Sequence, residues 1–141
     1  MVRPHLAELF DLAPHPEGGW YRRTWTAGIP VRTTDGRDRA TASAILFLLP
    51  AGEASAWHRV ASDELWIAQV GTVTLELGGD GAAPRPGSVV TLGTDVAAGR
   101  TPQVLVTSRV WQRTHLSVAD ALVTCVVSPA FDFADFELRG G

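Results

Sequence analysis

The stretch Gly52-Glu53-Ala54-Ser55-Ala56-Trp57-His58-Arg59-Val60-Ala61-Ser62-Asp63-Glu64-Leu65-Trp66-Ile67-Ala68-Gln69-Val70-Gly71 carries the strongest structural signal in this chain. It contains two apolar runs, typical of β-strands, that are punctuated by glycine. If the runs pair as a tight hairpin centred near Ala61, His58 and Glu64 become cross-strand neighbours, with Cβ atoms roughly 5 Å apart. A carboxylate beside an imidazole is a candidate site for acid-base chemistry.

The spacing within this stretch resembles the first motif of the cupins, G-x5-H-x-H-x3-E-x6-G. Gly52, His58, Glu64 and Gly71 fall in register with it, whereas Val60 stands where a second histidine is expected. Further segments are similar to one cupin family, long carried as a domain of unknown function (DUF985, or Cupin_5), whose members resemble the sugar-epimerase type of cupin. These segments are residues 15–22, 42–49, 55–60, 102–104, 110–112 and 131–137. The resemblance implies an all-β fold, the double-stranded β-helix or jelly-roll barrel.

Length and composition indicate one domain that spans residues 1–141. The chain has 141 residues, of which 45% are hydrophobic, enough for a core of its own. Its net charge of −3, with both signs scattered along the sequence, predicts no nucleic-acid partner. The single cysteine, Cys125, excludes an internal disulfide and is expected to be a buried apolar side chain. Because the sequence shows no apolar run of membrane-spanning length and no leader pattern, we expect a cytoplasmic protein without a membrane partner.

Glycine and proline divide the rest of the chain into short strands, which predicts an antiparallel sandwich or barrel. A short helix is expected within residues 2–12 and an exposed hairpin tip within residues 32–39. Residues 42–49 form an apolar run without alternation, so a subunit partner or an enclosing second sheet should cover this strand. The other strands are expected within residues 18–26, 72–77, 88–92, 103–107, 110–116 and 122–128.

The C-terminal tail presents three phenylalanines among acidic residues, over residues 131–138. Such a segment is costly to leave in water, so it is expected to cap the core or to pack across a dimer interface. A homodimer is also expected from the habit of the family and from the apolar strands.

The second cupin motif, P-x-G-x-x-H, is degraded in this chain. Residues 107–112 match its position, but its proline, glycine and histidine are all replaced, and Gln112 takes the histidine position. His115 does not restore the set, because strand alternation turns it to the opposite face. The ligands left for a metal are His58, Glu64 and Gln112, which would hold iron, nickel, zinc or manganese only loosely. We therefore expect no cofactor, with a divalent metal as the alternative.

The catalytic residues are predicted to be His58 and Glu64. A carboxylate near His58 fixes its tautomer and raises its pKa, which gives a base or an acid that works near neutral pH. The resemblance also places Glu17 near the barrel mouth. The alternative for Glu17 is a solvated side chain in front of two glycines.

The other predicted pocket residues follow from strand alternation. Tyr21, Ser43 and Gln112 are expected to orient the substrate by hydrogen bonds, and Trp66 is expected to form a wall, since it shares the face of Glu64. Trp57 and Trp111 should point away from the pocket. His5 and His15, in or beside the proline-bounded first segment, are assigned to loop and capping roles.

Three functions from different classes fit these residues. The first is a metal-independent isomerase, epimerase, cyclase or lyase that moves a proton on a small carbonyl compound, with His58 as the base. The second is a metal-dependent cupin oxygenase or lyase that uses His58, Glu64 and Gln112. The third is a non-catalytic module that binds a small ligand. The alternative to a functional site is that His58 and Glu64 form a structural pair inside the barrel.

Overall fold

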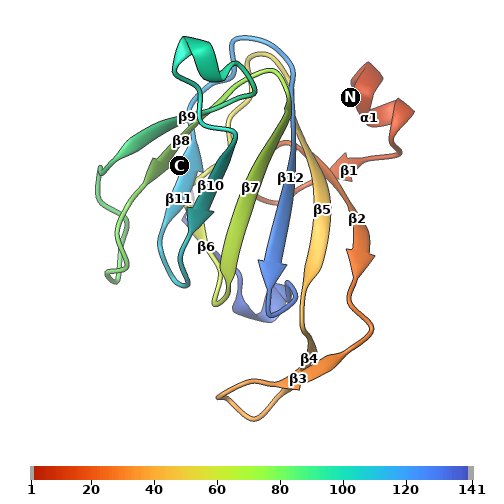
Figure 1. The fold of residues 1–141 in the computed structure, drawn as a ribbon, viewed down its shortest axis with the longest axis vertical. Coiled ribbons are helices and arrows are strands. Elements are labelled where there is room, and N and C mark those ends of the chain that lie inside the picture. Colours follow the sequence, from red (N-terminus) through yellow and green to blue (C-terminus); the bar gives the residue numbers. More distant parts are fainter. Residues whose placement is uncertain (1, 140–141) are drawn as a thin grey trace.

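Two antiparallel β-sheets face each other in the computed structural model, which describes residues 2–139 (Figure 1). The larger sheet has six strands in the order β1-β2-β5-β12-β7-β10. Their bounds are Ala13–Pro14 for β1, Trp20–Thr26 for β2, Ser43–Leu49 for β5, Ala121–Ser128 for β12, Asp63–Val70 for β7 and Gln103–Val106 for β10.

The smaller sheet has five strands in the order β13-β6-β11-β8-β9. Their bounds are Glu137–Leu138 for β13, His58–Arg59 for β6, Gln112–Thr114 for β11, Val73–Leu77 for β8 and Val89–Leu92 for β9. A separate hairpin of β3 (Pro30–Arg32) and β4 (Asp38–Ala40) extends away from both sheets, as predicted for this polar segment (Figure 1). The remaining elements are the helix α1 (His5–Leu9) and two 3-10 turns, η1 (Val96–Ala98) and η2 (Phe133–Asp135).

The space between the two sheets is filled by the inward side chains of both. Phe47 of β5 and Trp66 of β7 meet edge to face, with ring centroids 6.0 Å apart. Leu75 of β8 and Leu92 of β9 pack against them from the smaller sheet. Burial of such aromatic and branched side chains is the main favourable contribution to folding. This arrangement confirms the predicted all-β jelly-roll with a short N-terminal helix.

The outer face of β5 is covered by the N-terminal segment. Ala7 of α1 and Leu12 pack with Leu48 of β5 and with its neighbours Trp20 and Leu122. The second sheet covers the inner face of β5, which was one of the two predicted alternatives. The helix α1, which was not among them, covers the outer face near Leu48. The unbroken apolar pattern of β5 therefore needs no subunit partner at this position. Among the described residues, no helix is long and apolar enough to cross a membrane.

A double-glycine turn directs the chain from the N-terminal segment into β2. Gly18 and Gly19 both have positive φ, at 107° and 77°. A Cβ on Gly19 would lie 2.7 Å from Cζ of Phe47 and 2.8 Å from the carbonyl oxygen of Leu48. Only glycine fits both the backbone conformation and the space, and the turn places Glu17 at the edge of the barrel interior.

Replacement of Gly19 by alanine is expected to destabilise the protein by more than the φ penalty alone, which is about 1–2 kcal/mol. Gly79→Ala is the matched control, because Gly79 has φ of 73° but open space around its Cα. Urea unfolding of both variants measures the difference, and we expect Gly19→Ala to lose roughly 1–3 kcal/mol more from overpacking. Equal losses would show that the close approach to Phe47 and Leu48 is not limiting.

Candidate active site

The two sheets and the tail enclose a cavity that contains most of the predicted site residues. Its volume of about 30 Å³ is enough for roughly two water molecules. The polar residues that line it are His15, Glu17, Tyr21, Ser43, His58, Glu64 and Cys125. The apolar ones are Ile45, Val60, Val127, Phe131 and Phe136.

His58 is held in this cavity by contacts to both ring nitrogens. Nδ1 lies 2.7 Å from the carbonyl oxygen of Ala56, to which it donates, and Nε2 lies 3.0 Å from Oε2 of Glu17. The side chains of His58 and Glu17 are 3% and 9% exposed. Glu17 Oε2 has no directed hydrogen bond among the described residues, so the contact with His58 is an ion pair. That oxygen is left available to a hydrogen-bond donor on a ligand.

The predicted hairpin between His58 and Glu64 is wrong. His58 belongs to β6 of the smaller sheet, where it pairs with Gln112 and Leu138. Glu64 belongs to β7 of the larger sheet, and both edges of β7 are occupied, by β12 and by β10. The two side chains therefore face the cavity from opposite sheets, and the acid in contact with His58 is Glu17.

Glu64 is fixed by a chain of buried hydrogen bonds that begins at Trp66. The indole nitrogen of Trp66 donates to Oε1 of Gln112 at 2.8 Å, and Nε2 of Gln112 donates to Oε1 of Glu64 at 2.7 Å. Because an indole can only donate, the amide of Gln112 has one possible orientation. Trp66 and Gln112 thus lie behind Glu64 and do not line the cavity, contrary to their predicted roles as wall and substrate ligand.

The charges in the cavity are set by burial and by the two glutamates. Burial alone would lower the pKa of His58, but the negative charges of Glu17 and Glu64 outweigh it and raise this pKa to about 9. Burial raises the pKa of the Glu64 carboxyl, although His58 and Gln112 oppose the change. Burial also raises the pKa of the Cys125 thiol, and the side chain is buried, as predicted. At neutral pH His58 is therefore an imidazolium.

His15 is the site residue that the sequence interpretation missed. Its Nδ1 accepts the backbone N–H of Glu17 at 3.1 Å, and its ring meets Tyr21 edge to face at 4.6 Å and Phe136 at 5.8 Å. Burial lowers the pKa of His15, and the opposing charge of Glu17 does not outweigh it, so His15 is neutral and its 3.3 Å contact with Oε1 of Glu17 is no salt bridge. The signal in the sequence that could have identified His15 is its position two residues before Glu17, which places both side chains on one face of an extended segment.

The tail closes the cavity, which confirms capping as one of its two predicted roles. Phe136 lies over His58 with ring centroids 5.9 Å apart and planes at 29°. Phe131 meets Phe136 at 6.0 Å and lines the same space. These rings exclude water from the imidazolium, which strengthens its interactions with the two carboxylates.

The predicted metal ligands do not form a metal site of the usual cupin kind. The oxygen of Gln112 is engaged by Trp66, and both nitrogens of His58 already face oxygen atoms. His115 is 43% exposed and pairs with Glu76 outside the barrel, as predicted from strand alternation. Within residues 2–139, no group of three or more His, Cys, Asp or Glu side chains is arranged to hold a metal ion. The donor set therefore does not fit a tightly held transition metal.

Comparisons with known proteins agree with this fold. The model of the family described as "Cupin superfamily (DUF985)" matches residues 5–139. A solved protein from Shewanella oneidensis is 32% identical, with a TM-score of 0.82 over 96% of this chain and 82% of its own. A hypothetical protein from Leishmania major is 27% identical, with a TM-score of 0.82 over 94% of this chain and 84% of its own.

A more distant solved structure carries an enzyme name. A dTDP sugar isomerase from Desulfovibrio desulfuricans is 17% identical, with a TM-score of 0.59 over 86% of this chain and 82% of its own, which shows a shared fold. Comparison with curated sequences gives no match.

The stability that His58 contributes should fall as pH rises. The ordinary pKa of a histidine side chain is 6.5, and that of His58 in the folded protein is about 9. The contribution of His58 to stability is therefore complete below pH 6.5 and is lost as pH rises through 9. This shift corresponds to on the order of 3 kcal/mol. We expect the stability advantage of the wild type over His58→Gln to shrink by that order between about pH 6 and about pH 9.5 in urea unfolding.

His5→Gln is the control for this experiment, because it removes an exposed imidazole at the start of α1. Its stability should follow that of the wild type at both pH values. An advantage over His58→Gln that stays constant or grows with pH would contradict the raised pKa of His58.

Proposed function

The chain belongs to the DUF985 family (Cupin_5) of the cupin superfamily, and we propose that it is a small-molecule isomerase, epimerase, cyclase or lyase that works by metal-independent proton transfer. The observation that carries the proposal is the imidazolium of His58, buried in a cavity that the carboxyl groups of Glu17 and Glu64 also line. An acid and a base that face one small space are what proton transfer on a carbonyl compound requires.

The charge of the cavity favours a neutral substrate. Among the described residues, those that line it include no arginine, and the chain contains no lysine. The charge of His58 is already balanced by Glu17 at 3.0 Å. A carboxylate or phosphate group would lose its hydration there and meet two carboxylates without a free counter-charge. We therefore propose a small neutral hydroxycarbonyl compound as the substrate class.

The proposed roles of His58 and Glu64 differ from those predicted from sequence, because His58 is protonated at neutral pH. Glu64, as a carboxylate oriented by Gln112, removes a proton from the carbon next to the substrate carbonyl. His58 donates its Nε2 proton to the carbonyl oxygen, which leaves a neutral enediol. Glu64 returns this proton to the neighbouring carbon, while neutral His58 takes a proton back from the other hydroxyl of the enediol, which completes isomerisation. Both residues then regain their starting charges.

Other lining residues support binding in this proposal. Glu17 Oε2 accepts a substrate hydroxyl, since it has no directed partner. Ser43 and Tyr21 line the cavity and supply further hydroxyls at its edge. The solved neighbour described as a dTDP sugar isomerase shows that this fold accommodates isomerisation, while the acid-base geometry supports that class for this chain.

Solvent proton exchange tests the proposal without knowledge of the product. A panel of neutral hydroxyaldehydes and hydroxyketones is incubated with the protein in heavy water, and loss of the α-proton signal is followed by NMR. We expect exchange with at least one compound, and a loss of roughly 10²–10⁴-fold in His58→Gln and in Glu64→Gln. His115→Gln, on the outer face, should retain full activity. Undiminished exchange in folded His58→Gln would overturn the proposed mechanism.

A panel without any exchange would favour the binding-module alternative if a compound still raised the melting temperature of the wild type. A homodimer, a cytoplasmic location and the absence of nucleic-acid and membrane partners stay predictions.

The metal-dependent alternative predicts that the protein is purified with a metal. We expect less than roughly 0.1 iron, nickel, zinc or manganese per chain after purification without chelators, because the donor set is incomplete. Elemental analysis measures the content, and addition of each metal should leave the exchange rate and the melting temperature unchanged. Stoichiometric metal, with stability lost on chelation and restored by that metal, would decide for the alternative.

A further inference from the structure

The cavity is too small for the substrates that its chemistry suits. Its volume of about 30 Å³ admits roughly two water molecules, less than the smallest hydroxycarbonyl compound needs. Much of its wall consists of strands within the two sheets, which cannot move apart without breaking backbone ladders. The rest comes from the tail, through Phe131 and Phe136, from the turn before β2, through His15 and Glu17, and from Val60. Phe136 of the tail lies over His58, so lifting the tail exposes the imidazole.

The tail is attached to the barrel more weakly than the strands are. Beyond β12 it forms a single 3-10 turn, η2, and then the two-residue strand β13, which pairs with β6 through Glu137 and Leu138. Its three phenylalanines pack on one another, with Phe131 and Phe133 at 4.6 Å and Phe133 and Phe136 at 5.8 Å, and Phe133 and Phe136 also meet the ring of His15. Phe133 is 48% exposed. Residues 131–136 thus form one small aromatic unit at the edge of the barrel.

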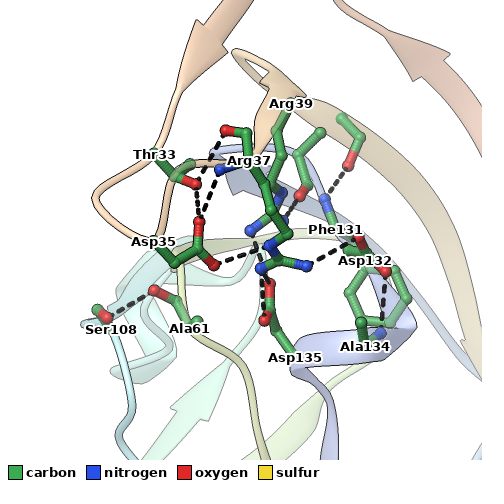
Figure 2. A network of polar contacts seen from close by, with 12 residues as sticks. Thr33, Asp35, Arg37, Arg39, Ala61, Ser108, Phe131, Asp132, Ala134 and Asp135 are labelled. Atoms are coloured by element: carbon green, nitrogen blue, oxygen red, sulfur yellow. Dashed lines mark hydrogen bonds and ion pairs between the residues drawn. The ribbon is translucent and has the colours of Figure 1, made fainter.

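Figure 2 shows what holds this unit in place. Two arginines of the β3–β4 hairpin converge on Asp135, with Arg37 Nη2 at 2.7 Å from Oδ1 and Arg39 Nη1 at 2.7 Å from Oδ2. Arg37 also reaches Asp132 at 3.3 Å, and Arg39 donates to the carbonyl oxygen of Ala130. The hairpin otherwise stands apart from both sheets, so these contacts give it a role that the barrel itself does not require.

We propose that residues 131–136 form a lid over His58, and that Arg37 and Arg39 of the β3–β4 hairpin latch it through Asp135. Substrate enters when the lid lifts, and the lid closes over it to exclude water from the imidazolium. The Arg37 part of the latch suits repeated opening, because Arg37 is 36% exposed and ion pairs near the surface are weak and screened by salt. The side chain of Arg39 is buried and forms the firmer part. The size argument rests on the small-molecule substrate class proposed above, whereas the labelling test of the lid does not use the proposed reaction.

Cys125 reports lid opening directly. It is the single cysteine of the chain, it lines the cavity and it is 2% exposed, so a thiol reagent reaches it only when the wall opens. The rate of its modification by methyl methanethiosulfonate, a small neutral reagent, is measured by mass spectrometry at one pH in the intact protein. Labelling through the lid should depend little on low urea, whereas labelling through global unfolding accelerates as steeply as the unfolding equilibrium.

We expect Asp135→Asn to accelerate labelling by about threefold to tenfold or more, the effect of losing one ion pair with half-exposed Arg37 and one with the buried side chain of Arg39. Arg37→Gln should act in the same direction. Asp38→Asn is the matched control, because it breaks the Arg32–Asp38 pair of the same hairpin, at 3.2 Å, without touching the tail. Raising sodium chloride to about 0.5 M should accelerate labelling of the wild type more than that of Asp135→Asn.

Three results would overturn the lid and its latch. One is an equal labelling rate in the wild type, Asp135→Asn and Arg37→Gln. Another is an acceleration by Asp38→Asn as large as that by Asp135→Asn, which would reflect general loosening of the hairpin. The third is wild-type labelling that follows global unfolding at every urea concentration. If one latch variant fails to fold, the other takes its place. None of these three results depends on the proton-exchange assay.

Discussion

The ion pair of Glu17 and His58 is the interaction on which the site depends. A charge removed from water is costly unless an opposite charge compensates it, and here each partner supplies the other's counter-charge at 3.0 Å. The pair also joins distant parts of the chain, because Glu17 precedes β2 and His58 lies in the smaller sheet. The backbone repeats the connection, since the N–H of Ala56 donates to the carbonyl oxygen of Glu17 at 2.8 Å. The same contact therefore closes the barrel edge and sets the charge of the site.

Gln112 changes the set of donor atoms that the usual cupin motifs supply. It stands where the second motif has a histidine, and it connects Trp66 to Glu64 instead of offering a lone pair to the cavity. A neutral amide fixes the carboxylate without bringing another charge into the interior. The interior is thus organised around two carboxylates and one proton-carrying imidazole, an arrangement suited to proton transfer rather than to coordination.

The sequence predicted the positions of the strands better than it predicted which strands pair. Apolar runs, alternation and glycine or proline punctuation located β5, β8 and β12 within a residue or two, and alternation gave the outward direction of His115. The hairpin between His58 and Glu64 was wrong because strand pairing is decided over long distances: β12 and β10 fill both edges of β7. Local spacing cannot show that competition.

The candidate site was predicted only in part, because local patterns identify its strand residues but not the residues that long-range packing brings to them. His58, Glu64, Glu17, Tyr21 and Ser43 all line the cavity. His15 was missed because prolines on either side indicate a loop, while the rings that bury it come from Tyr21 and from the far end of the chain. The most direct measurement of the central claim is the titration of His58 by nitrogen NMR in protein labelled at histidine. The account predicts a ring protonated at both nitrogens at neutral pH that titrates near 9. A neutral His58 ring at pH 7, titrating at or below 6.5, would contradict it.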